Sequence, residues 1–159
     1  MRAWIARMTE DNIDQSAIEK AGEILKNGGL AAFPTETVYG LGGNALDAKA
    51  SEKIYAAKGR PSDNPLIVHI ADFEQIYDLC PAVPPQAKQL AEAFWPGPLT
   101  MIVPEGDCIP DEVSCGLDTV GIRLPSHPMA RALIRESGVP LAAPSANTSG
   151  RPSTTTAAH

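Results

Sequence analysis

The feature that most constrains the fold is the alternation of short apolar runs with amphipathic segments along the chain. Apolar runs of this kind, bounded by turn-forming residues, are typical of buried strands. The expected strands are residues 3–6, 30–33, 66–70, 99–103, 120–124 and 139–143, and the expected helices are residues 17–25, 48–58, 73–80, 84–94 and 128–137. This order predicts an α/β fold with a mixed or largely parallel sheet. In such sheets ligands bind outside the carboxyl ends of strands.

Charge and cysteine content exclude several classes of protein. The net charge of −6 argues against a protein that coats nucleic acid, although it allows a local basic groove. Cys80, Cys108 and Cys115 are widely spaced, so we expect reduced thiols rather than a disulfide framework or a zinc site. Apolar runs are far shorter than the roughly 18 residues of a membrane span, and the N-terminus lacks a signal-peptide pattern. We therefore expect a cytoplasmic protein with no membrane partner.

Three polar loops lie next to expected strands, at residues 34–44, 58–65 and 144–153. The first contains G-L-G-G-N-A, but the acidic residue that a dinucleotide site needs after the next strand is missing. The hydroxyl and amide groups of the first and third loops suit phosphate or ribose contacts. They also suit ordinary turns, which the residues alone favour.

The second loop carries two cations, Lys58 and Arg60, and its backbone is stiffened by Pro61 and Pro65. A stiff loop with two cations suits a phosphorylated ligand. A solvated surface turn explains the same residues equally well. Lys58 also stands at an expected helix C-terminus, where the helix dipole favours a cation.

The remaining polar residues limit the kinds of reaction that the sequence could support. His69 alternates with apolar neighbours as a core histidine would, and His127 precedes a proline as a helix cap would. There is no carboxylate cluster for a dedicated Mg²⁺ cage. Lys58, Arg60 and Arg123, with hydroxyl and amide groups, suit phosphoryl or nucleotidyl transfer in which the nucleotide holds most of the metal.

Five motifs follow one another along nearly the whole chain: F-P-T-E-T-V-Y-G-L-G, K-G-R-P-S-D-N-P-L-I-V-H-I, W-P-G-P-L-T, G-L-D-T-V-G-I-R-L-P-S-H-P and A-P-S-A-N-T-S-G-R-P-S. Together they closely resemble the YrdC-like family of threonylcarbamoyl-adenylate synthases. The resemblance implies a twisted, open α/β sheet with flanking helices around a concave, locally basic cavity. It also implies an enzyme that uses ATP with Mg²⁺, L-threonine and bicarbonate, and that releases pyrophosphate. Its product would feed threonylcarbamoyladenosine formation in tRNA through downstream transfer machinery.

The resemblance also assigns roles to residues. The matching nucleotide-site positions are Lys58 and Arg60, as the catalytic pair, with Asn64, Thr119, Ser145, Asn147 and Ser153. The matching threonine-site positions are Thr37, His69, Arg123 and Ala143. Arg123 would bind the carboxylate of the amino acid.

Family members continue past the last motif with strands that complete the cavity. The resemblance therefore implies a single domain over residues 1–159 that is shortened at its C-terminal end. Two alternatives stay open: a carbamoyl-adenylate-handling relative, and a non-catalytic module that binds double-stranded RNA in the basic concavity. The form of K-G-R-P-S-D-N-P-L favours the threonine-using branch.

Overall fold

The computed structural model describes residues 13–34, 39–58 and 65–144. The helices are α1 Gln15–Lys26, α2 Ala48–Lys58, α3 Ile76–Leu79, α4 Pro85–Phe94, α5 Asp111–Ser114 and α6 Pro128–Ser137, with a 3-10 turn at Phe73–Gln75. The strands are β1 Ala31–Pro34, β2 Tyr39–Asn44, β3 Ile67–His69, β4 Thr100–Pro104, β5 Thr119–Arg123 and β6 Leu141–Ala143.

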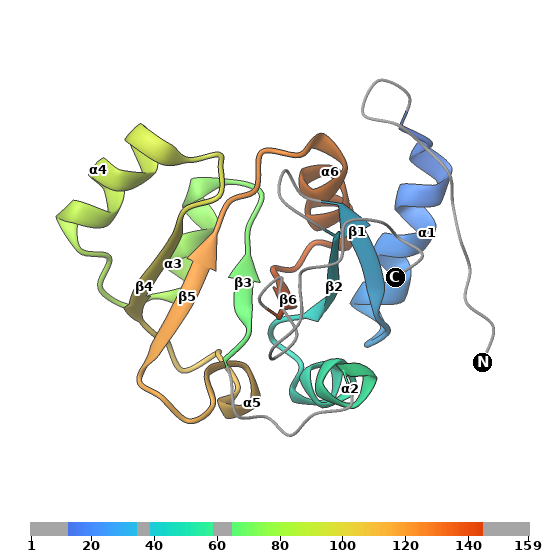
Figure 1. Cartoon of the computed structure of the whole chain (residues 1–159), viewed down its shortest axis with the longest axis horizontal. Helices are drawn as coiled ribbons and strands as arrows, with labels where there is room; N and C mark the ends of the chain where they lie inside the picture. Colours follow the sequence, from blue (N-terminus) through green and yellow to red (C-terminus); the bar gives the residue numbers. More distant parts are fainter. Residues whose placement is uncertain (1–12, 35–38, 59–64, 145–159) are drawn as a thin grey trace.

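The strands form one sheet in the order β1-β2-β6-β3-β5-β4, which Figure 1 shows from right to left. β3 and β5 are parallel, whereas the other four neighbouring pairs are antiparallel. The predicted α/β class and mixed sheet are confirmed. The expectation of a largely parallel sheet is wrong, because β6 enters between β2 and β3 and runs against both.

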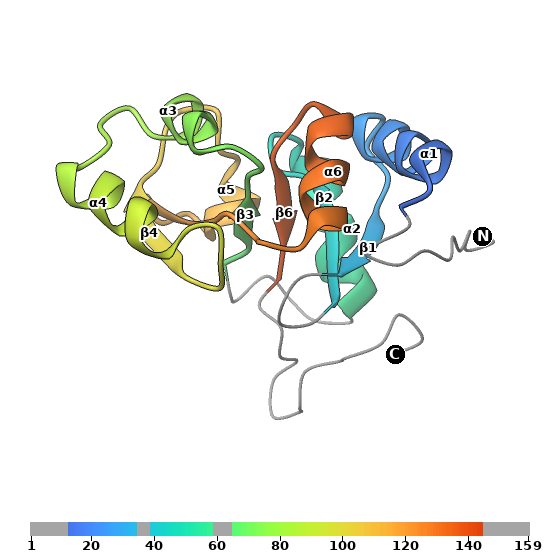
Figure 2. The same ribbon diagram turned by 90° about the horizontal axis from the view of Figure 1, so that it is seen from above.

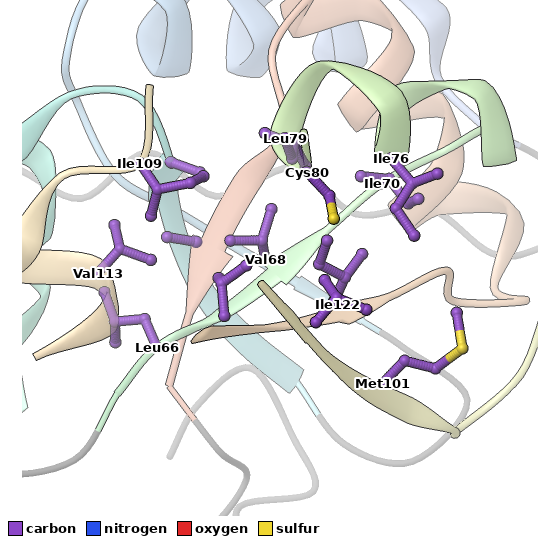
Figure 3. Packing of buried hydrophobic residues seen from close by; sticks show 14 of the residues in the cluster. Leu66, Val68, Ile70, Ile76, Leu79, Cys80, Met101, Ile109, Val113 and Ile122 are labelled. Carbon is purple, nitrogen blue, oxygen red and sulfur yellow. The ribbon is translucent and has the colours of Figure 1, made fainter. Parts of the chain in front are cut away.

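One face of the sheet carries the larger hydrophobic core. Val68 of β3 and Met101 of β4 each pair directly with Ile122 of β5, so the three side chains point to the same face. Residues of α2, α3, α4 and α5 pack against them, and Figure 3 shows this packing around Val68 and Ile122.

On the opposite face, α1 and α6 cover only the part of the sheet near β1 and β6. The two helices lie side by side in both views (Figures 1 and 2). Their residues Leu25 and Leu133 join Phe33 and Leu141 of the sheet in a second core. At the other side of this face, Ile102 of β4 is 67% exposed. The face is therefore open to solvent near β4.

Local signals set several helix ends, and the cap predicted at His127 is confirmed. Asp14 caps α1, because its Oδ1 accepts from the backbone N–H groups of Ser16 and Ala17. His127 caps α6 by accepting at Nδ1 from the N–H of Met129 at 3.2 Å. Gly138 ends α6 in the left-handed conformation with φ 74°, which glycine adopts without steric cost.

Two elements differ from the prediction. Residues 39–44 were expected in a loop but form β2, in which Gly42 lies against the Phe33 ring; a Cβ there would stand 2.6 Å from a ring carbon. Glycine is uncommon in strands, so the sequence of this segment does not indicate one. The strand forms because its backbone pairs with β1 and β6. No helix was expected between the strands at residues 99–103 and 120–124, yet α5 forms there. The expected strand at residues 3–6 lies outside the described residues.

Candidate functional site

The structure describes five of the predicted site residues. They are Lys58, His69, Thr119, Arg123 and Ala143. The other six, Thr37, Arg60, Asn64, Ser145, Asn147 and Ser153, lie outside the described residues. Of Lys58 the structure describes the backbone, which forms the last residue of α2 as predicted.

Four of the five share one face of the sheet. His69 of β3 pairs with Arg123 of β5, and Ala143 of β6 pairs with Ile67, two residues before His69. Because side chains alternate along a strand, Thr119 and Arg123 point to the same face of β5, and His69 and Ala143 join them there. This is the face that is open near β4.

The four lie toward different ends of the strands. His69 and Arg123 stand at the carboxyl ends of the parallel pair. Thr119 begins β5, and Ala143 ends β6 beside the start of β3. The predicted residues therefore do not all lie at the carboxyl ends of the parallel pair, because Thr119 begins β5 and the antiparallel β6 ends beside the start of β3.

The described residues that flank the three polar loops lie at the Thr119 end of the sheet. Figure 2 shows the end of β1, the starts of β2 and β3 and the end of β6 toward its lower side. Hydrogen bonds to α5 connect α2 to the residue just before β3, at the Thr119 end of the sheet. The Tyr55 hydroxyl donates to the Glu112 carbonyl at 2.9 Å, and the N–H of Leu66 donates to the Val113 carbonyl at 2.8 Å.

His69 is a neutral, buried histidine. It is 4% exposed, and its ring meets Phe33 edge-on at a centroid distance of 5.9 Å. Its Nδ1 lies 3.1 Å from the Ile67 carbonyl oxygen, which can only accept, so the tautomer with the proton on Nδ1 satisfies this contact. Burial lowers the pKa of His69 to about 4, against the smaller opposing effect of backbone hydrogen bonds. The neutral ring therefore offers Nε2 as an acceptor at neutral pH.

Arg123 is a buried cation held by the backbone. It is 8% exposed, and its Nε donates to the Gly97 carbonyl at 3.2 Å. Burial lowers the pKa of the guanidinium from its ordinary value. A guanidinium largely removed from water interacts strongly with a carboxylate or phosphate, which it can bind through two parallel hydrogen bonds.

The contact between Arg123 and Gly97 was not predicted. Residues 95–98 follow the helix expected at residues 84–94, and the resemblance included them in a motif without giving them a role. Nothing local in the sequence reveals that this turn meets the end of β5.

The described ranges lack two other features that would indicate a function, a metal site and a membrane-spanning helix. They contain no group of three or more histidine, cysteine, aspartate or glutamate side chains placed to hold a metal ion. No helix in these ranges combines the length and the apolar character that crossing a membrane requires.

Comparison with known proteins gives the family. Residues 23–159 match the Sua5, YciO and YrdC family, described as "Telomere recombination". The chain belongs to this family. It is 54% identical over 99% of its length to a threonylcarbamoyl-AMP synthase of Bacillus subtilis and covers 46% of that protein. It is 52% identical to the threonylcarbamoyl-AMP synthase of Pyrococcus abyssi, over 94% of this chain and 44% of that protein.

Solved structures of family members also match this chain. The crystal structure of Pyrococcus abyssi Sua5 complexed with L-threonine matches with a TM-score of 0.89 at 53% identity, over 93% of this chain and 44% of that one. Escherichia coli YciO matches with a TM-score of 0.77 at 28% identity, over 88% of this chain and 68% of that one. These matches confirm the YrdC-like fold. The chain spans less than half the length of the two synthases.

Proposed function

We propose that this chain forms L-threonylcarbamoyladenylate and pyrophosphate from ATP, L-threonine and bicarbonate, for threonylcarbamoyladenosine modification of tRNA. The observation that carries the proposal is 54% identity, over 99% of the chain, to a threonylcarbamoyl-AMP synthase. A relative that handles carbamoyl-adenylate is less well supported, because the nucleotide-bound structure of HypF is only 26% identical.

The geometry supports a ligand that lies along β5. By the family pattern Thr119 contacts the nucleotide and Arg123 binds the carboxylate of threonine. The two residues are four positions apart on one face of β5, which corresponds to about 13 Å at the rise of a strand. A molecule with a nucleotide at one end and an amino acid at the other therefore fits extended along this strand.

The threonine end is assigned to His69 and Arg123. The P. abyssi relative was crystallised with L-threonine. In this chain Arg123 would bind the carboxylate, and the neutral His69 would accept a hydrogen bond at Nε2 from the substrate. By the family pattern Ala143 and Thr37 also belong to the threonine set, although Ala143 lies beside the start of β3, toward the Thr119 end of the face.

The nucleotide end is assigned to the loops that flank Thr119. Lys58, Arg60 and Asn64 on one side, and Ser145, Asn147 and Ser153 on the other, would contact ATP. Mg²⁺ would enter with ATP on its phosphate oxygens, as it commonly does at phosphoryl-transfer sites.

The proposed reaction needs little acid–base chemistry. The threonine amine reacts with bicarbonate to give a carbamate with loss of water, and a carbamate oxygen then attacks the α-phosphorus of ATP. The bond from the α-phosphorus to its bridging oxygen breaks, and pyrophosphate leaves. Lys58 and Arg60 would stabilise the charge that develops on the phosphates.

The test is threonine-dependent pyrophosphate release from ATP by the full chain, including any residues that follow His159. We expect Lys58→Ala and Arg60→Ala to abolish the release, and Arg60→Lys to reduce it because lysine lacks the bidentate geometry. Full release by either alanine variant would refute the assignment of these two residues. Release without threonine would refute the synthase itself.

The proposal places the enzyme in the cytoplasm, where ATP and tRNA occur together, upstream of the machinery that transfers the threonylcarbamoyl group. A contact with RNA is a separate expectation. Binding of double-stranded RNA with a steep salt dependence and no ATP turnover would instead favour the non-catalytic module.

A further inference from the structure

The turn at residues 95–99, W-P-G-P-L, connects α4 to β4 and has a closed, internally bonded form. The indole Nε1 of Trp95 donates to the carbonyl of Leu99 at 2.8 Å, which closes the turn across its base. Trp95 itself is buried and packs against the Phe73 ring at a centroid distance of 6.2 Å. The turn is therefore anchored to the core at one end and to the start of β4 at the other.

Gly97, at the centre of this turn, bonds to two consecutive residues at the end of β5. Its N–H donates to the Leu124 carbonyl at 2.9 Å. Its carbonyl accepts from Nε of Arg123 at 3.2 Å. The first bond fixes the distance between turn and strand, so the second places a rigid acceptor beside the guanidinium.

The position requires glycine for lack of space. A Cβ on Gly97 would stand 2.6 Å from the Phe94 carbonyl oxygen, which belongs to the backbone at the end of α4 and cannot rotate away. Any side chain at residue 97 would therefore displace the turn and move the carbonyl that Arg123 contacts.

We propose that the 95–99 turn is the positioning element for Arg123 and sets the affinity of the site for the carboxylate of the amino-acid substrate. The inference rests on the proposed function, in which Arg123 binds that carboxylate. A guanidinium whose Nε is bonded to a fixed carbonyl has its plane fixed as well. Bidentate recognition of a carboxylate depends on the orientation of that plane. The turn lies at the Arg123 end of β5, so it acts on the threonine end of the site and not on the Thr119 end.

The test separates the two substrates. In Gly97→Ala we expect the KM for L-threonine to rise about tenfold or more, since misplacement by about 1 Å can cost up to about a hundredfold. The KM for ATP should change less than about twofold on the same reasoning. Trp95→Phe removes the indole N–H together with one ring of a buried side chain, so it should lower the melting temperature and shift the threonine KM in the same direction by a smaller factor.

A matched control is Gly29→Ala, in the connection between α1 and β1 at the opposite side of the sheet. A Cβ there would stand 2.5 Å from Cγ2 of Ile24 and 3.0 Å from the Ile24 carbonyl oxygen, so this position is also too crowded for a side chain. This variant should lower the melting temperature and leave the threonine KM unchanged.

A second measurement distinguishes a change in the orientation of the Arg123 guanidinium from a general loss of stability. The preference for L-threonine over L-threonine amide depends on the carboxylate, and it should fall in Gly97→Ala and Trp95→Phe but not in Gly29→Ala. If Gly97→Ala does not fold, Trp95→Phe decides the matter. An unchanged preference and KM in a folded turn variant overturns the inference, provided that Arg123→Ala abolishes the preference. If Arg123→Ala leaves the preference intact, the assignment of Arg123 in the proposed function fails instead.

Discussion

His69 and Arg123 lie directly opposite each other on β3 and β5, the one parallel pair among the described strands, and both side chains are buried. A second cation beside a buried arginine would be repelled. The low pKa of His69 avoids that conflict, because the imidazole is neutral at physiological pH. The pair therefore combines one fixed cation with one neutral acceptor on the open face of the sheet.

The pH dependence of stability should carry the signature of His69. Its pKa is about 4 in the folded protein and 6.5 in the reference state, so the unfolded chain binds a proton first as the pH falls. Stability is unaffected above about pH 6.5, declines as the pH falls from 6.5 to 4, and loses about 3 kcal/mol in total. Urea unfolding of the wild type and His69→Asn at pH 7.5, 5.5 and 4.5 measures this. Identical pH profiles for the two proteins would contradict the expectation.

Tyr55→Phe should loosen the link between α2 and α5. The variant removes the bond from the phenol to the Glu112 carbonyl, and we expect a loss of about 1 kcal/mol in unfolding free energy. Because α2 ends at Lys58, the KM for ATP should rise as well. The control is Tyr77→Phe at an exposed position, which should stay within about 0.5 kcal/mol of the wild type. Equal stabilities of the two variants would show that the Tyr55 bond contributes nothing.

Truncation to alanine should destabilise the protein very differently at two isoleucines on neighbouring strands. Ile122 of β5 is fully buried, and Ile122→Ala should cost about 2–5 kcal/mol. Ile102 of β4 points to the open face, and Ile102→Ala should change stability by less than about 0.5 kcal/mol. Denaturant titration of both variants tests the assignment of the two faces. A large cost at Ile102 would mean that its face is covered in solution.

Gln75 should contribute more to the stability of the fold than the ion pair between Arg135 and Asp72 beside it. Its Oε1 accepts from the N–H groups of Ala71 and Asp72 at 2.7 and 3.0 Å, so Gln75→Ala should cost about 1–2 kcal/mol. Arg135 pairs with Asp72 at 2.8 Å, but both side chains are exposed, and Arg135→Gln should cost less than about 1 kcal/mol. The reverse order in thermal unfolding would contradict this ranking. Added salt should reduce only the Arg135 effect.

The chain by itself determined those features that depend on neighbouring residues. Asp14, His127 and Gly138 act at helix ends through bonds and backbone angles within a few residues, so their roles could be predicted. The strand expected at residues 120–124 is present as β5. The order of the five motifs correctly indicated the family.

Only the tertiary structure decided the pairing and direction of the strands. β2 exists because its glycine-rich backbone pairs with β1 and β6, which no local propensity encodes. The antiparallel β6 brings Ala143 beside the start of β3, at the Thr119 end of the face and away from Arg123. The bond from Arg123 to Gly97 joins residues 26 positions apart. Such contacts depend on how the elements pack in three dimensions, and for that reason the sequence named the candidate residues while the fold placed them.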